Sequence, residues 1–251
     1  MITTHKLAVE GVFGRKEIPV ELYVNHKNES RRLYILLHGA YGKAYHHQPT
    51  KYQILSELLA KQHSVGFYQT SRNFMQMERP ELNYDEYRNQ SFGGKQFADE
   101  WEDVQRGVEA IIKSYTLKKG KPKEIICIGF SMGGLWSCLL TQKYKEISKI
   151  YAFGSGTKFN LPSSFPLFES FPKVSFFRAV LSKYRGELHV IHGSNDELTS
   201  EKSAFSLFKL AIISSIKSYH EWLGVDHQFV CVNGENREAE LIESIVKMID
   251  N

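Results

Sequence analysis

One serine is flanked by glycines at the spacing that a strained turn requires. Ser131 lies in the segment 129–134, G-F-S-M-G-G, between the apolar run 125–128 and an apolar stretch that suits a helix. A strand, G-x-S-x-G and a helix in this order place a serine hydroxyl above the end of a sheet. Side chains two residues to either side of such a serine would collide, and Gly129 and Gly133 remove that collision. We therefore predict that Ser131 is a nucleophile.

A serine hydroxyl is a weak nucleophile at neutral pH, so it needs a base, and the base needs a group that orients it. When the serine lies in a strand–turn–helix context, the acid and then the histidine follow it along the chain. Asp196 follows a predicted buried strand, and His227 comes after the next predicted strand. We predict that His227 is the general acid and base and that Asp196 fixes its tautomer.

Alternatives to both partners remain. Glu197 and Asp226 are close in sequence to Asp196 and His227, although each is less well placed than Asp196. Among the other histidines, those that compete with His227 on residue type alone are His38, His46, His47, His192 and His220. Among these, His38 and His192 each end a strand before a glycine, which favours a structural role in bonding nearby backbone.

Metal binding is not expected at the adjacent pair His46 and His47. Consecutive side chains on an extended segment point apart, and no motif supplies a third ligand. The sequence therefore implies no metal and no organic cofactor.

The tetrahedral intermediate of acyl transfer needs two backbone N–H donors. Met132, directly after the nucleophile at the start of a helix, can supply one of them. The second is expected from the loop after the earlier strand 33–37, where we choose Ala40 and keep Tyr41 as the alternative.

Strands and helices alternate along most of the chain, which predicts an α/β fold with a doubly wound, mainly parallel sheet in a single domain, residues 1–251. The alternating pattern up to Val24 predicts an antiparallel hairpin at one edge. Strands are expected at 33–37, 65–68, 125–128, 150–153, 188–192 and 219–223. Helices are expected at 52–59, 97–111, 135–140, 205–212 and 241–249.

Two segments interrupt the alternation. Residues 70–96 are polar and irregular, which is typical of a long loop on the active-site side of the domain. Residues 156–186 contain six phenylalanines and three prolines. This second segment is either a small cap that presents aromatic surface to a substrate or an excursion whose phenylalanines belong to the core.

The composition excludes several classes of protein. No apolar run is long enough to cross a membrane, and the N-terminus lacks the layout of a signal peptide. Three cysteines without paired spacing suggest no disulfide framework, which favours the cytoplasm. The net charge of +4 on 251 residues is modest, and the lysines at 118–123 are better explained as a solvated loop than as a nucleic-acid site.

Four ordered motifs together resemble the α/β-hydrolase superfamily, in particular its serine esterases and monoacylglycerol-lipase-like members. They are H-G-A at 38–40, G-F-S-M-G-G at 129–134, G-S-N-D at 193–196 and G-V-D-H at 224–227. The resemblance spans roughly residues 18–250. It implies an α/β-hydrolase fold and a carboxylic ester hydrolase that acts on a small-molecule ester, with an apolar acyl or alcohol part as one option. A thioesterase, amidase or acyltransferase would use the same residues, and a non-catalytic binding module is a further alternative.

Overall fold

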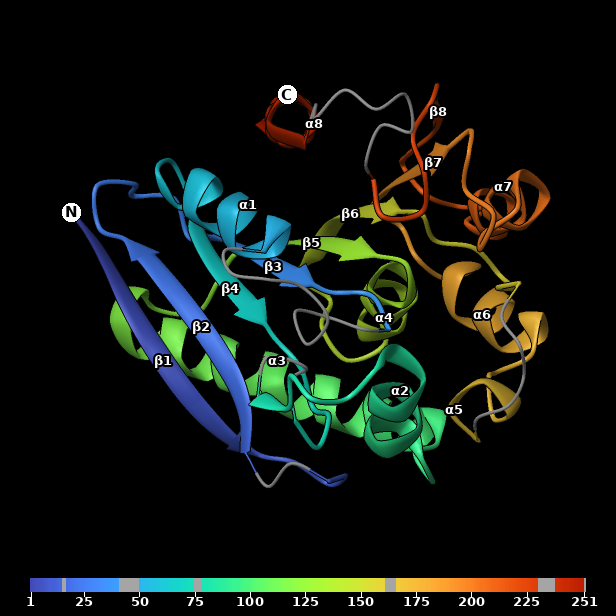
Figure 1. Ribbon diagram of the computed structural model, residues 1–251. Helices are drawn as coiled ribbons and strands as arrows, with labels where there is room; N and C mark the ends of the chain where they lie inside the picture. The colour runs from blue at the N-terminus through green and yellow to red at the C-terminus, as the bar shows by residue number, and fades with distance from the viewer. Residues whose placement is uncertain (15–16, 41–49, 75–77, 161–165, 230–237, 251) are drawn as a thin grey trace.

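The computed structural model describes residues 1–14, 17–40, 50–74, 78–160, 166–229 and 238–250. Within these residues the chain forms one eight-stranded sheet of strand order β1-β2-β4-β3-β5-β6-β7-β8 (Figure 1). The strands are β1 (Ile2–Glu10), β2 (Glu17–Asn25), β3 (Arg32–Leu37), β4 (Ser64–Tyr68), β5 (Glu124–Phe130), β6 (Ile147–Phe153), β7 (Glu187–Gly193) and β8 (Ile216–Trp222). β2 pairs antiparallel with β1 and β4, and the strands from β4 to β8 are parallel.

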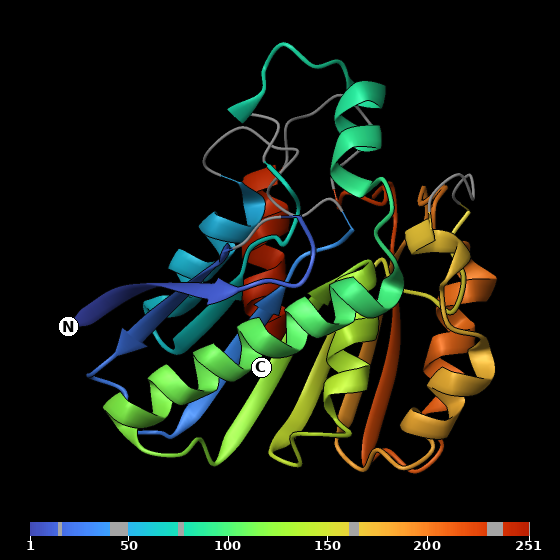
Figure 2. The ribbon, with the colours of Figure 1, turned by 90° about the horizontal axis from the view of Figure 1, so that it is seen from below.

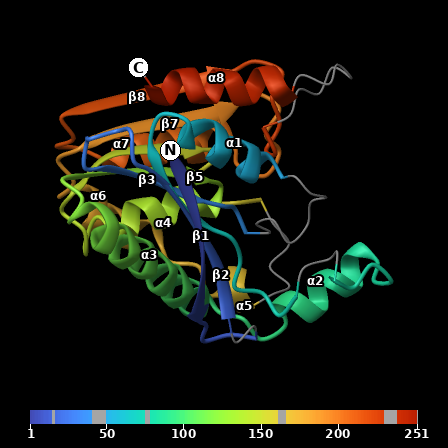
Figure 3. The same cartoon turned by 90° about the vertical axis from the view of Figure 1, so that its left-hand side faces the viewer.

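Helices cover both faces of this sheet (Figure 3). They are α1 (Lys51–Ala60), α2 (Tyr84–Phe92), α3 (Phe97–Lys119), α4 (Met132–Leu140), α5 (Pro166–Glu169), α6 (Val174–Leu181), α7 (Glu201–Leu210) and α8 (Glu238–Asp250). α1 and α8 pack on one face, and α3, α4, α6 and α7 pack on the other. The predicted doubly wound, mainly parallel sheet and its antiparallel hairpin at the edge are both confirmed.

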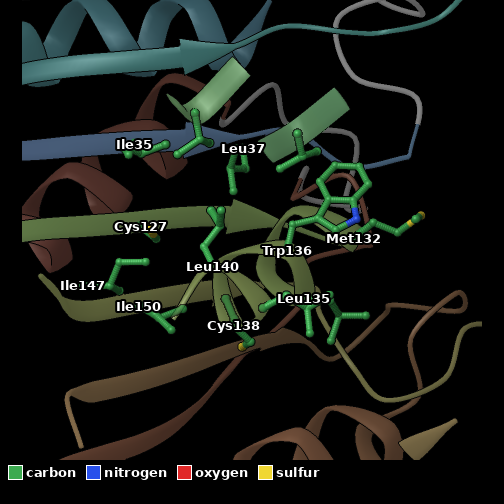
Figure 4. Close-up of a cluster of buried hydrophobic side chains, with 14 of the residues drawn as sticks. Ile35, Leu37, Cys127, Met132, Leu135, Trp136, Cys138, Leu140, Ile147 and Ile150 are labelled. Carbon is green, nitrogen blue, oxygen red and sulfur yellow. The ribbon is translucent and has the colours of Figure 1, made fainter. Parts of the chain in front are cut away.

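The central strands are buried on both faces, because alternate side chains of each strand enter different cores. In β3, Ile35 faces the α3 and α4 side, whereas Leu36 faces the α1 and α8 side. Figure 4 shows how α4 closes the first of these cores, with Trp136 and Leu140 lying against the strands. α4 is apolar around its whole circumference and all its residues are buried, which fixes the start of that helix behind Ser131.

The sequence of α3 accounts for the way this helix packs on the sheet. Val104, Val108 and Ile111 lie on one face at helical spacing and are fully buried. Lys118 and Lys119 occupy the last turn, where the helix dipole favours cations. As Figure 2 shows, the helix runs across one face of the sheet and ends just before β5.

The prediction of an irregular loop at 70–96 is wrong over its second half. Tyr84–Phe92 forms α2, which begins with a capping box between Asn83 and Glu86. Figures 2 and 3 show α2 standing out from the layers, beyond the ends of the strands. The helix has few apolar residues, so hydrophobic periodicity gave no signal, and its start is instead marked by the N-cap pattern.

The segment 156–186 contains both kinds of phenylalanine that the sequence left open. Phe177 of α6 is fully buried in the core, whereas Phe159, Phe168 and Phe171 are only partly buried. Phe165 lies outside the described residues. The segment therefore contributes to the core and also presents aromatic surface.

Candidate active site

Ser131 lies at a strained turn between β5 and α4. Its backbone has φ 53° and ψ −118°, which is unusual for a residue with a side chain. A Cβ atom at Gly129 would lie 2.3 Å from the backbone of Gly133 and Gly134, and one at Gly133 would lie 2.3 Å from the carbonyl oxygen of Leu37. The G-x-S-x-G glycines are thus required by close backbone approach, as predicted.

His227 bridges the serine and a carboxylate. Its Nε2 atom is 2.9 Å from Ser131 Oγ, and its Nδ1 atom is 2.9 Å from both carboxylate oxygens of Asp196. The structure therefore brings together the three residues chosen from the sequence. It is Asp196, and not the alternatives Glu197 or Asp226, that holds Nδ1 of His227.

The Asp196 carboxylate is itself held in place. Its Oδ1 atom accepts hydrogen bonds from the backbone N–H groups of Leu198, at 2.9 Å, and Thr199, at 2.7 Å. The Thr199 hydroxyl in turn donates to the carbonyl oxygen of Gly154, at 2.9 Å. This ties the turn after β7 to the residue that follows β6, so the carboxylate faces His227 in a fixed orientation.

The loop that carries His227 is anchored by backbone hydrogen bonds to the turn after β7. Asn195 N–H donates to the carbonyl oxygen of Val225, at 2.9 Å, and Ser194 N–H donates to that of Trp222, at 3.0 Å. Phe229 packs its buried ring against Phe130 and Phe153, and it adopts a positive φ of 57°.

The segment after β3 lies directly beside the serine. A Cβ atom at Gly39 would be 3.0 Å from Ser131 Cβ and 3.7 Å from its Oγ. Ala40 follows and is buried, and Met132 is the first residue of α4. Both predicted oxyanion donors thus belong to segments that flank Ser131. The alternative donor, Tyr41, lies outside the described residues.

Of the competing histidines that the structure describes, His38, His192 and His220, none bonds to Ser131. His38 is fully buried, and its Nδ1 contacts the carbonyl oxygen of Gly39, as the predicted structural role requires. Burial, with Arg72 nearby, lowers the pKa of His38 to about 3. His192 is buried, and within the described residues its Nδ1 has no hydrogen-bond partner, so this nitrogen makes no bond to nearby backbone there. His220 bonds Ser218, whereas His46 and His47 lie outside the described residues.

A buried cluster of charges, which the sequence analysis missed, lies behind His38. Lys95 and Glu100 are buried almost completely and form an ion pair, and Lys95 Nζ also donates to Ser71 Oγ, at 2.7 Å. Burial opposes the charge on Glu100, but Lys95 and Arg72 outweigh burial and lower the pKa of Glu100 to about 2. The sequence holds no local signal for this pair, because an acid in the first turn of a helix, as Glu100 is, is ordinarily exposed to solvent.

Replacing Glu100 by glutamine is expected to destabilise the protein by about 3–5 kcal/mol, because the buried Lys95 ammonium loses its counter-charge. Urea unfolding at pH 7 measures the change. Glu102→Gln is the matched control on the same helix, where the ion pair with Arg106 is solvent-exposed and is worth about 1 kcal/mol or less. Equal effects of the two substitutions would contradict the account of the buried pair.

Asp103, a further buried residue of this cluster, is expected to make the protein less stable as the pH rises. Burial raises the pKa of this carboxyl group to about 6 from 3.8. The folded state therefore binds more protons than the unfolded state between these two values. The contribution of Asp103 to stability is present in full below pH 3.8 and is lost as the pH rises towards 6.

Asp103→Asn is expected to remove this loss while its amide oxygen still accepts from Val12 N–H, as the Asp103 carboxylate does at 2.8 Å. Relative to the native protein, the variant should gain about 2 kcal/mol between pH 4 and pH 7. Urea unfolding at four pH values in this range tests the prediction, and a difference between the two proteins that does not change with pH would contradict it.

Within the described residues, no group of three histidine, cysteine, aspartate or glutamate side chains could hold a metal ion. No helix in the same residues is both long and apolar enough for a membrane crossing.

No protein-family model matches the chain, and a search of the curated proteins found no match. Solved structures do match over nearly the whole chain. An esterase domain from Rhodothermus marinus superposes with a TM-score of 0.62 at 13% identity, covering 99% of this chain and 97% of that one. A cold-adapted esterase from an Arctic intertidal metagenomic library gives a TM-score of 0.65 at 17% identity, covering 99% and 93%.

A third match is a structure of metagenome-derived lipolytic enzymes, with a TM-score of 0.60 at 12% identity and coverage of 89% and 95%. At such identities the likeness concerns the fold, which agrees with the sheet order and with the helices on both faces. The chain has the α/β-hydrolase fold.

Proposed function

We propose that this protein is a serine hydrolase that cleaves carboxylic esters through an acyl-enzyme. The observation that carries the proposal is the pair of contacts made by His227, whose Nε2 is 2.9 Å from Ser131 Oγ while its Nδ1 is 2.9 Å from the Asp196 carboxylate. A serine hydroxyl, an imidazole and a carboxylate in this order form the arrangement that activates serine in acyl transfer. That esterases are among the solved structures with this fold supports the same reading.

The reaction begins when Ser131 Oγ attacks the ester carbonyl carbon and its proton passes to His227 Nε2. The imidazolium that forms is stabilised by the Asp196 carboxylate. The oxygen of the tetrahedral intermediate accepts hydrogen bonds from the backbone N–H groups of Ala40 and Met132. His227 then gives the proton to the departing alkoxide, which leaves as the alcohol.

Water completes the cycle. It attacks the acyl group on Ser131 Oγ while His227 takes one of its protons, and the second tetrahedral intermediate collapses as that proton returns to Ser131. The acid is released and the free serine is restored. The strained backbone of Ser131 keeps the hydroxyl exposed to substrate throughout.

The test is hydrolysis of p-nitrophenyl esters of graded acyl length. The release of p-nitrophenolate measures the rate. The native protein is expected to show saturable hydrolysis, and His227→Ala to lose it while remaining folded by circular dichroism. Hydrolysis that His227→Ala retains at the native rate would overturn the proposal, as would a folded native protein that is inactive on every ester.

We place this activity in the cytoplasm and take its substrate to be a small-molecule ester. Cys127 and Cys138 are buried free thiols, which supports a reducing compartment.

A further inference from the structure

A cleft with aromatic walls opens beside His227. Its volume is ≈ 600 Å³, and eight of the described residues line it, including Thr157, Lys158, Phe159, Phe168, Phe171 and Lys173. We call it the phenylalanine cleft. Phe159 joins it to the candidate active site, because its ring meets the His227 ring edge-on at a centroid distance of 6.4 Å.

One wall of the cleft is fixed to α7 and to the turn that carries Asp196. Lys158 N–H donates to Ser203 Oγ, at 2.7 Å, and this hydroxyl donates back to the carbonyl oxygen of Lys158 at the same distance. Asn160 N–H donates to the carbonyl oxygen of Leu198, at 2.7 Å. Phe159 is therefore held in a segment that is bonded on both sides to the support of the candidate site.

The other wall is fixed to α3. Ser170 Oγ accepts from Phe97 N–H, at 2.8 Å, and the rings of Phe97 and Phe171 meet edge-on at 5.3 Å. The rings of Phe171 and Phe159 also meet edge-on, at a centroid distance of 5.7 Å. Phe159 and Phe171 both line the cleft, so together they form an aromatic surface against which a further aromatic group can pack.

Charge distinguishes this cleft from a hollow that lies next to Asp196 and includes His227 in its lining. The eight residues of the phenylalanine cleft include Lys158 and Lys173, both exposed, and no aspartate or glutamate. Among the described residues, the hollow next to Asp196 is lined by that carboxylate together with Glu197 and Asp226, and by no lysine or arginine. A negatively charged substrate group is therefore repelled from the hollow next to Asp196 and attracted to the phenylalanine cleft.

We infer that the phenylalanine cleft binds an aromatic group carrying a carboxylate, so that the preferred substrate is an ester with an aryl carboxylate in its alcohol or acyl part. The inference rests on the proposed ester hydrolysis and names its substrate class. The phenylalanine rings pack against the aryl group, and Lys158 and Lys173 meet the carboxylate where it reaches solvent.

The experiment compares matched esters that differ in one charge. 4-Acetoxybenzoate against 4-acetoxybenzamide places the charge in the alcohol part, and methyl 4-carboxybenzoate against methyl 4-carbamoylbenzoate places it in the acyl part. For each pair, kcat/KM for the anion is divided by kcat/KM for the amide. This ratio is then divided by the ratio of the two rate constants for hydrolysis by hydroxide, which corrects for the intrinsic reactivity of the esters. We call the result the corrected ratio. We expect a corrected ratio of about 10 for at least one pair, and a fall towards 1 when the ionic strength is raised from about 0.05 M to about 0.5 M.

In the double variant Lys158→Gln with Lys173→Gln, the corrected ratio is expected to lie between about 0.5 and about 2, because kcat/KM for the anion falls when the two positive charges are removed. Lys183→Gln, at an exposed lysine that lines a different cavity, is the matched control and should leave the ratio unchanged. A native ratio near 1 for both pairs, or one that the double variant retains, overturns the inference.

Failure of this inference is separable from failure of the proposed function. If the native protein hydrolyses both members of each pair equally and Ser131→Ala hydrolyses neither, ester hydrolysis stands and the anionic substrate class is wrong. If Ser131→Ala hydrolyses them at the native rate, the proposed function itself is wrong.

Discussion

Ser131→Ala is expected to lower kcat for ester hydrolysis by about 10⁶-fold, because the acyl-enzyme can no longer form. Residual hydrolysis should remain above the rate in water, since the N–H groups of Ala40 and Met132 would still bind the developing oxyanion. Steady-state kinetics on a p-nitrophenyl ester measure kcat and KM for both proteins. KM should change little, because the substrate contacts that do not involve the nucleophile remain.

A control shows that the loss is chemical and not a matter of folding. Ser131 has a positive φ, and alanine meets the same backbone strain as serine, so the variant should unfold in urea at the same midpoint as the native protein. A variant that keeps more than about 1% of native kcat, well above the residual catalysis that remains without a nucleophile, would show that another group attacks the ester.

Asp196→Asn is expected to lower kcat by about 10⁴-fold through the wrong histidine tautomer. The reason lies in the two backbone N–H groups, of Leu198 and Thr199, that donate to Oδ1 of Asp196. They would hold the introduced amide by its oxygen, which places the NH₂ group where Oδ2 now faces His227 Nδ1. That NH₂ group donates to Nδ1, so the proton of the neutral imidazole moves to Nε2, which then has no lone pair for the Ser131 proton.

The pH profile separates this effect from a loss of structure. The rate of the Asp196→Asn variant should rise with pH as hydroxide replaces the lost base, while its unfolding midpoint changes little. Glu197→Gln, at the exposed neighbour in the sequence, is the matched control and should keep kcat within about 3-fold. A loss of similar size in Glu197→Gln would mean that the wrong carboxylate has been assigned.

The strands, most helices and the candidate triad could be predicted from the sequence because each depends on a local pattern. Ser131 is flanked by the glycines of a sharp turn, and Asp196 and His227 each follow a strand. Since parallel strands end at the same edge of a sheet, residues at those positions meet whatever the details of the packing. This is why three residues that are far apart in the sequence could be chosen together.

The buried pair of Lys95 and Glu100 could not be predicted in the same way. A lysine and a glutamate five residues apart are usually solvated, and burial of both depends on contacts with Ser71 and with the core behind His38. Phe229 and Thr199 support the candidate site through packing and a hydrogen bond to distant residues. Such roles depend on tertiary partners, for which a single sequence has no local signal.

For the phenylalanines of 156–186, the sequence likewise could not predict which are buried in the core. Their spacing is equally compatible with a core and with an exposed aromatic surface. Phe177 and Phe159 differ only because α6 packs Phe177 into the core while the bonds of Lys158 and Asn160 hold Phe159 beside His227.

Labelling with a fluorophosphonate tests the central claim, an activated Ser131, most directly. Attack by an activated serine on phosphorus expels fluoride and leaves a stable phosphonyl adduct, whose position peptide mapping by mass spectrometry identifies. We expect one adduct per native chain, on Ser131, that is lost in Ser131→Ala, in His227→Ala and after heat denaturation. Absence of the adduct from folded native protein, or labelling that persists in Ser131→Ala, would contradict the account.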